Sequence, residues 1–192
     1  MASSIERWLT AASVPVLAFI VGAIALPRPV PVSAEKEDVD RESLGAAVSR
    51  IRPQPKSAVN AELGDVVKVL GADLPEAALS RGARLSIRSY FEALGEMERD
   101  WQIFLHIDAK TGATRLHGDH FPARGKYQTT LWQPGDFIAD DWSMIIPRDA
   151  SAGVYDVFIG FYIGEERLQW SGGTASAHDG KNRVRVGSIV IE

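Results

Sequence analysis

The residues best suited to chemistry in this sequence are a run of histidines and carboxylates. His117, Asp119 and His120 lie in one His-Gly-Asp-His run, and Asp108 precedes it closely. Such side chains can bind a metal ion, but two histidines three residues apart in a glycine-containing loop do not share a helix face, and their spacing matches no zinc signature. We therefore predict a solvent-exposed loop pair, no metal site and no other cofactor.

The other polar motifs do not predict catalysis. Asp140 and Asp141 are adjacent, so on a strand they point to opposite faces and cannot act together as an acid–base pair. The runs Ser171-Gly172-Gly173 and Gly71-Ala72 lack the strand–turn–helix context of a nucleophile elbow or phosphate loop. The sequence has no cysteine, which excludes thiol nucleophiles and disulfides. These features predict a protein that is not an enzyme.

The length and net charge of the chain limit the number of domains and the possible partners. The 192 residues suffice for one core, and 21 Lys and Arg residues oppose 25 Asp and Glu residues, for a net charge of −4. The two signs are interspersed along the chain, whereas affinity for phosphate backbones needs clustered cations. Nucleic acid is therefore excluded as a partner.

Period-two alternation of apolar residues indicates the elements that must position these groups. In residues 84–91, Leu85, Ile87 and Phe91 fall on one face, and residues 101–108 and 155–163 alternate in the same way. Further strands are predicted at Val66–Leu70, Thr114–His117, Phe137–Ile145, Leu168–Trp170 and Val184–Ile191. Turn residues separate them at 110–112, 134–135, 147–153 and 179–182.

About seven or eight short strands without a long helix predict an all-β fold. We expect an antiparallel two-sheet β-sandwich over residues 62–192, immunoglobulin-like or jelly-roll-like, with the strand order left open.

The same alternation predicts an outer aromatic face. The residues expected to point away from the core, with Arg88 and His106 among them, are Tyr90, Phe104, Phe158 and Tyr162. Aromatic side chains on an outer sheet face suit stacking on sugar rings or burial against another protein. The alternative is that the domain's own loops cover them. We take these four residues as the predicted binding site.

An ordered series of motifs resembles a known family. It consists of Asp119-His-Phe-Pro122, Gly125-Lys-Tyr127, Thr130-Leu-Trp132-Gln-Pro134-Gly135, Asp140/Asp141, Pro147, Gly153-Val-Tyr155 and Gly160-Phe-Tyr162. Over roughly residues 62–192 this series resembles the C-terminal β-sandwich domain appended to some bacterial multi-spanning membrane glycosyltransferases.

The resemblance implies an extracytoplasmic, non-catalytic module. The multi-spanning catalytic part has no counterpart in this sequence, so glycosyl transfer does not carry over. The motif residues also have a structural explanation. Pro134-Gly135 and Gly153 are expected to shape turns, and Trp132 and Tyr155 to fill the core.

Residues 9–26 predict a membrane anchor. These eighteen uncharged residues would span about 27 Å as a helix, close to the thickness of the hydrocarbon layer. The alternative is a signal peptide cleaved after Val32-Ser33-Ala34. We expect retention in the inner membrane as a single-pass anchor, with residues 1–8 in the cytoplasm and the C-terminal domain in the periplasm or exterior.

Residues 27–61 are expected to be a linker. Pro27, Pro29 and Pro31 predict a short extended stalk. Glu42–Ile51 follows as a candidate short helix with Leu44, Val48 and Ile51 on one stripe, or else as coil in a solvated tether.

Two functions fit these predictions. The preferred one is an accessory subunit whose sandwich docks on an integral membrane protein complex and stabilises it. The alternative is a membrane-tethered carbohydrate-binding module that acts on cell-envelope glycans.

Overall fold

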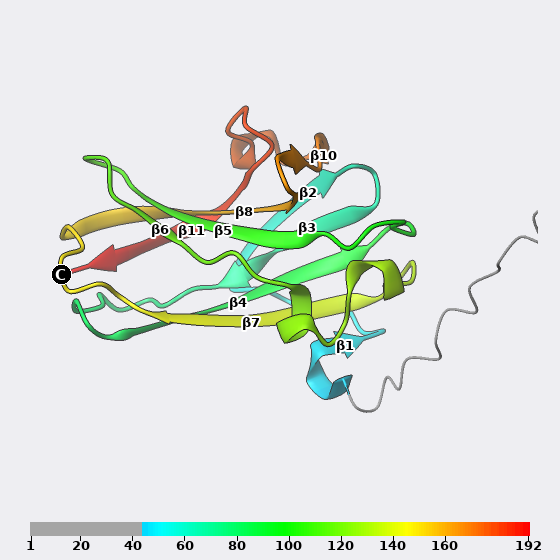
Figure 1. The fold of residues 1–192 in the computed structure, drawn as a ribbon, viewed down its shortest axis with the longest axis horizontal. Coiled ribbons are helices and arrows are strands. Elements are labelled where there is room, and N and C mark those ends of the chain that lie inside the picture. The colour runs from blue at the N-terminus through cyan, green and yellow to red at the C-terminus, as the bar shows by residue number, and fades with distance from the viewer. Residues whose placement is uncertain (1–43) are drawn as a thin grey trace, which may run out of the picture. The chain divides into compact units, whose positions relative to one another are not determined.

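The computed structural model describes residues 44–192, which form two antiparallel β-sheets (Figure 1). The first sheet has the strand order β1-β7-β4-β3-β2-β10, and the second has the order β11-β8-β5-β6, with β9 paired to β8. The strands of the first sheet are β1 (Val48–Ser49), β2 (Ser57–Leu63), β3 (Val67–Asp73), β4 (Arg84–Ala93), β7 (Phe137–Ile145) and β10 (Trp170–Gly173). Those of the second are β5 (Gln102–Ala109), β6 (Arg115–His117), β8 (Gly153–Ile163), β9 (Glu166–Arg167) and β11 (Val184–Ile191). Four short 3₁₀ turns complete the fold: η1 (Gly45–Ala47), η2 (Pro122–Gly125), η3 (Thr129–Leu131) and η4 (Ala175–Ala177).

The predicted all-β two-sheet fold is confirmed, and so are the strand faces. Ile103, Leu105 and Ile107 of β5 are buried, as are the alternate residues Tyr155, Val157, Ile159 and Phe161 of β8. Both strands send these side chains into one core shared with the first sheet. Burying each such side chain contributes about 1.5–3 kcal/mol, which is why one face of each strand is apolar.

The two strands predicted at Phe137–Ile145 and Val184–Ile191 are found at those bounds. The prediction of one strand at Leu168–Trp170 is wrong. Glu166–Arg167 pairs with β8 in the second sheet, whereas Trp170 pairs with Leu63 in the first. The chain crosses between the sheets at this point, and the apolar Leu168 is buried at the crossing.

The sandwich also begins earlier than the predicted boundary at residue 62. Strand β1 lies inside the predicted linker 27–61, and β2 begins inside it. The described part of the candidate helix Glu42–Ile51 is instead the short turn η1 followed by β1, in which Val48 pairs with Ile138. The burial of β2 alternates along its whole length, but its signal in the sequence is weak because the inward-facing set includes the polar Ser57 and the small Ala61.

The predicted anchor at residues 9–26 and the proline stalk lie outside the described residues. Within residues 44–192, no helix is long and apolar enough to cross a membrane.

The motif that contains Tyr127, Trp132, Pro134 and Gly135 has a packing role. Trp132 is buried against Phe91 and Phe161, with ring centroids 6.1 and 6.0 Å away. Gly135 has φ +82° and completes the turn that follows Pro134. The Tyr127 hydroxyl donates a 2.6 Å hydrogen bond to the buried Asp136 carboxylate. The structural explanation predicted for Trp132 and for the Pro134-Gly135 turn is therefore confirmed.

Candidate functional site

A pocket of about 690 Å³ brings together four segments that are far apart in the sequence. They are the end of β3 with the residues after it, the first half of β4, the second half of β7, and the segment between β6 and η3. The lining residues are Asp73, Leu74, Pro75, Ser86, Ile87, Arg88, His120, Arg124, Asp141, Trp142 and Ser143. We refer to this pocket as the groove.

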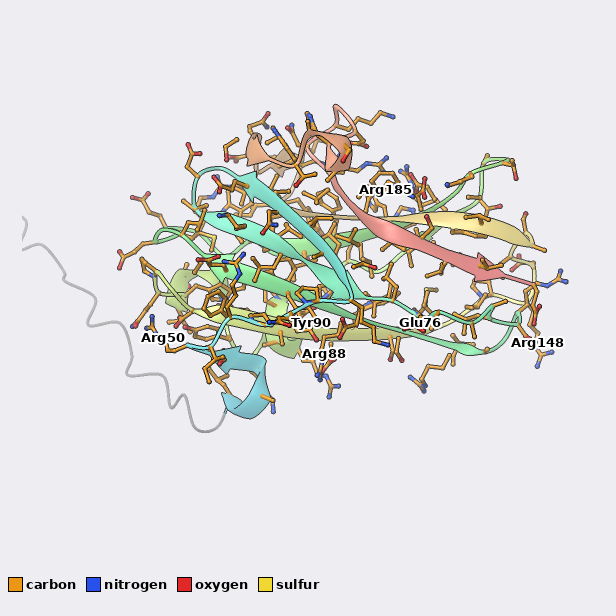
Figure 2. All side chains as sticks on the ribbon, turned by 180° about the vertical axis from the view of Figure 1, so that it is seen from behind. Arg50, Glu76, Arg88, Tyr90, Arg148 and Arg185 are labelled. Atoms are coloured by element: carbon orange, nitrogen blue, oxygen red, sulfur yellow. The ribbon has the colours of Figure 1, made fainter. Side chains whose placement is uncertain are left out.

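The polar lining of the groove is organised around one ion pair. Arg88 on β4 donates two hydrogen bonds of 2.6 Å to the Asp141 carboxylate directly across on β7. These hydrogen bonds lower the pKa of Asp141. Beside it, the Tyr90 hydroxyl donates a 2.7 Å hydrogen bond to Asp73. Figure 2 shows Arg88 and Tyr90 next to each other on the first sheet. The ion pair between Arg88 and Asp141 is half-exposed, so both charged groups are accessible to a ligand.

The backbone beside the groove is strained. Ala123 and Arg124 both have left-handed dihedral angles, with φ of 50° and 58°. Each such non-glycine residue costs about 1 kcal/mol or more and persists only when its surroundings hold it there. Here the Ala123 amide donates a 2.7 Å hydrogen bond to Asp140, whose side chain is buried. The strained turn carries the exposed Arg124 at the groove.

His120 is engaged at both ring nitrogens. Nε2 lies 2.6 Å from the Asp140 carboxylate and Nδ1 lies 2.6 Å from the Gly118 carbonyl oxygen. The Gly118 carbonyl can only accept, so Nδ1 carries a proton and donates to it, while Nε2 is engaged by Asp140. Burial lowers the pKa of His120 and is the largest single effect, but the hydrogen bonds and charges of Asp140, Gly118 and Asp119 together outweigh it, so the pKa is raised. Both ring nitrogens are therefore committed to partners within the fold.

Trp142 is held between two residues of the same segment. A Cβ atom placed on Gly118 would lie 2.3 Å from Trp142 Cζ2, so the glycine backbone lies against the indole. The His120 ring stacks on the same indole with a centroid distance of 6.4 Å and an interplanar angle of 25°. Gly118 and His120 therefore position a half-buried tryptophan in the lining of the groove.

The four aromatic residues predicted as a binding site do not form one surface. Phe104, Phe158 and Tyr162 belong to the second sheet, whereas Tyr90 belongs to the first. Phe104 is only 2% exposed and Phe158 only 9%. The Arg167 guanidinium lies 4.7 Å from the Phe104 ring centroid, and that of Arg183 lies 4.0 Å from the Phe158 centroid.

Arginines of the domain itself thus cover Phe104 and Phe158, which is close to the predicted alternative that the domain's own loops cover this face. Phe104 can lie flat because Gly160 is its partner on β8, where a Cβ atom would come within 2.1 Å of the phenylalanine ring.

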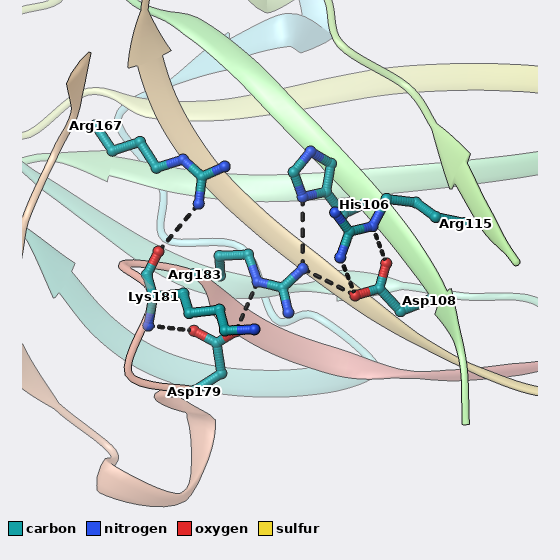
Figure 3. Close-up of polar contacts among 7 residues, drawn as sticks. All are labelled: His106, Asp108, Arg115, Arg167, Asp179, Lys181 and Arg183. Carbon is teal, nitrogen blue, oxygen red and sulfur yellow. Dashed lines mark hydrogen bonds and ion pairs between the residues drawn. The ribbon is translucent and has the colours of Figure 1, made fainter. Parts of the chain in front are cut away.

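Hydrogen bonds and ion pairs hold the side chains of Arg167 and Arg183 in place (Figure 3). Arg183 donates hydrogen bonds to Asp108 and Asp179, at 2.9 and 2.6 Å. Arg115 forms a second, two-pronged contact with Asp108. Burial raises the pKa of Asp108, but the hydrogen bonds from Arg115 and Arg183 outweigh it and lower the pKa to about 2. The outer face of the second sheet is therefore a paired, charged surface and not an aromatic patch.

The histidine pair of the sequence analysis is divided between two faces. His120 turns toward Asp140, while His117 faces outward, directly opposite His106 on β5. The predicted solvent pair of His117 and His120 is therefore wrong. The sequence does contain a pattern that pairs His106 with His117. A hairpin turning at residues 110–112 places residues 106 and 117 opposite each other.

No protein-family model and no curated protein matches the sequence.

Proposed function

We propose that this chain is a non-enzymatic, extracytoplasmic binding module and that its groove holds a hydroxyl-rich glycan. The observation that carries the proposal is the lining of the groove. It offers two arginines, two aspartates and two serine hydroxyls, and Trp142, whose indole packs on the inner side of β7, also contributes to the lining. Small-molecule sites combine apolar and aromatic lining with a few convergent polar groups, and this groove has that composition.

The balance of charge favours a ligand of low charge. Arg88 and Arg124 are matched by Asp73 and Asp141, and Arg88 is already paired with Asp141. A strongly anionic ligand would need cations in excess, whereas sugar hydroxyls can accept from arginine and donate to carboxylates. The strained turn at Ala123 and Arg124 adds support, because backbone strain clusters at functional sites.

The groove also supports binding over catalysis. The polar groups of the groove are largely engaged with one another, which suits recognition of hydroxyl groups. Asp141 is paired with Arg88, and His120 is hydrogen-bonded at both ring nitrogens. The Ser143 hydroxyl accepts a 3.0 Å hydrogen bond from Arg84.

The second candidate, an accessory subunit that docks on a membrane protein complex, is motivated by the combination of a single predicted anchor with a non-catalytic module, and the outer aromatic face would have been its docking patch. Its support is reduced by the arginines that cover Phe104 and Phe158. Over residues 44–192 the exposed large apolar residues are scattered, and only Val154 and Val190 are paired strand neighbours. A docking patch of that size is small for a protein partner.

We further propose that residues 9–26 tether the module to the inner membrane and that the sandwich lies in the periplasm or exterior. The support is the uncharged eighteen-residue run and the resemblance to extracytoplasmic sandwich domains.

The test is binding of neutral and acidic oligosaccharides to the full chain in mild detergent, measured by calorimetry. Arg124→Ala should weaken binding of a neutral oligosaccharide about tenfold, since a hydrogen bond to a charged group is worth about 1.5–3 kcal/mol. Arg148→Ala is the matched control. It removes the same charge from an exposed residue outside the groove (Figure 2) and should bind as the wild type does.

The proposal would be overturned if the wild type bound no oligosaccharide. It would also be overturned if Arg124→Ala bound the oligosaccharide with the same affinity as the wild type. Co-purification of a stoichiometric membrane protein complex, unaffected by Arg124→Ala, would favour the accessory subunit.

A further inference from the structure

We propose that His106, His117 and Asp119 form a binding site for a divalent transition-metal ion such as Zn²⁺ on the outer face of the second sheet. One ligand atom from each residue can be chosen so that all three lie within 4.8 Å of one another. Two imidazoles and one carboxylate, with one side left open, are a common ligand set for such ions. The site is separate from the groove, and the proposal does not depend on the proposed function.

The pairing of β6 with β5 brings the three residues together. His106 and His117 are direct partners in the antiparallel ladder. Beyond β6 the chain stays hydrogen-bonded to β5, because the Gly118 amide donates to Leu105 and the His120 amide donates to Ile103, at 2.8 and 2.9 Å. Side chains alternate along such a segment, so His117 and Asp119 both point outward, beside His106.

The geometry requires only a small closing movement. Tetrahedral coordination at about 2.0–2.1 Å places two ligand atoms roughly 3.4 Å apart, so the widest pair must approach by about 1.4 Å. His106 is held in place because it is buried and stacks on Phe104 with a 4.8 Å centroid distance. His117 and Asp119 are exposed, so their side chains can close onto the ion.

His106 is available as a ligand. Its Nδ1 atom lies 3.5 Å from Arg183 Nη1, which is longer than an ordinary hydrogen bond, so an ion need not displace a strong partner.

The surrounding charges do not exclude a cation. Arg115 is held by Asp108, and Arg183 is held by Asp108 and Asp179, so both guanidinium groups are paired with carboxylates (Figure 3). Asp119 adds a further negative charge, which acts on both His106 and Tyr162. The negative charge of Asp119 is therefore needed to offset the positive charges of Arg115 and Arg183 at the metal site.

The experiment is a Zn²⁺ titration of the chelator-treated full chain in mild detergent, by calorimetry and by NMR of the histidine rings. We expect one Zn²⁺ per chain, with shifts of the His106 and His117 resonances. His117→Ala and Asp119→Asn should each weaken binding at least tenfold. Both residues are exposed, so the melting temperature without metal should stay that of the wild type.

His178→Ala is the matched control, because it removes an exposed histidine that lies outside the three-residue cluster. This variant should bind Zn²⁺ as the wild type does. Absence of stoichiometric binding to the wild type would overturn the proposal. So would unchanged affinity in both His117→Ala and Asp119→Asn, or a loss of binding in His178→Ala.

Discussion

The contact between Gly118 and Trp142 predicts that any side chain at position 118 displaces the indole that lines the groove. Replacing Gly118 by alanine adds one methyl group 2.3 Å from Trp142 Cζ2 and 2.6 Å from Cε2. Carbon atoms pack at about 3.5–4.0 Å, so the indole must retreat by at least about 1.2 Å. Gly118 is not among the glycines with positive φ, so the substitution introduces no backbone strain and the packing effect is isolated.

The expected cost follows from that displacement. Trp142 is held on one side by His120, so the indole cannot turn away without disturbing a partly buried ring that is hydrogen-bonded to Asp140. Overpacking of this kind costs about 1–3 kcal/mol. For a domain of this size each kcal/mol lowers the melting temperature by about 2–4 °C. Gly118→Ala should therefore melt several degrees below the wild type and bind groove ligands more weakly.

The assay is urea unfolding followed by tryptophan fluorescence, with Gly172→Ala as the matched control. Gly172 also lacks positive φ, and its added Cβ would meet only Glu62 Oε2, at 3.6 Å, so that variant should be close to wild type. In a Trp142→Leu background the cost of Gly118→Ala should largely disappear, because the clashing atoms belong to the indole. Equal stability of the two glycine variants, or an undiminished cost in the Trp142→Leu background, would refute the packing argument.

Two further predictions concern other contacts. Gly160→Ala places a methyl group 2.1 Å from Phe104 Cζ, so it should destabilise the domain by a similar amount, about 1–3 kcal/mol. It should also expose the Phe104 ring, which increased binding of a hydrophobic dye would detect. Unchanged stability and unchanged dye binding would contradict the packing of Phe104 on Gly160. Because the pKa of His120 is raised in the folded protein, its stabilising contribution is complete below the unfolded value of about 6.5 and is lost as pH rises through the folded value. In chelator-treated protein the free energy of unfolding should fall as the pH rises above about 6.5, and His120→Asn should flatten that fall; an equal slope in both proteins would show that folding does not raise the pKa of His120.

Local patterns were sufficient to predict the faces of the strands. Apolar residues at every second position of residues 101–108 and 155–163 can be buried together on only one side, so the inward set could be read without knowing the partner strands. The pairing of His106 with His117 was equally local, because a hairpin turn fixes the register of its own two strands. It was missed because the histidines were compared by spacing along the chain and not across the hairpin.

Exposure of the outer residues could not be predicted in this way. Whether Phe104 is open to solvent depends on Gly160, its partner on another strand, and on Arg167, which reaches over it from a third segment. The groove depends likewise on strand order, since the residue after β3 and the middle of β7 meet only because β4 lies between those strands. A period-two pattern states which side a residue faces and carries no information on what covers that side.

The segment His117–His120 shows why a compact motif can mislead. Its four residues resemble one polar site in sequence, but continued pairing with β5 sends alternate side chains to opposite faces. Gly118 and His120 turn inward, where they hold Trp142 and bind Asp140, while His117 and Asp119 turn outward, beside His106. A single stretch of extended backbone can therefore position the tryptophan that lines the groove and place His117 and Asp119 beside His106, because successive residues never compete for the same face.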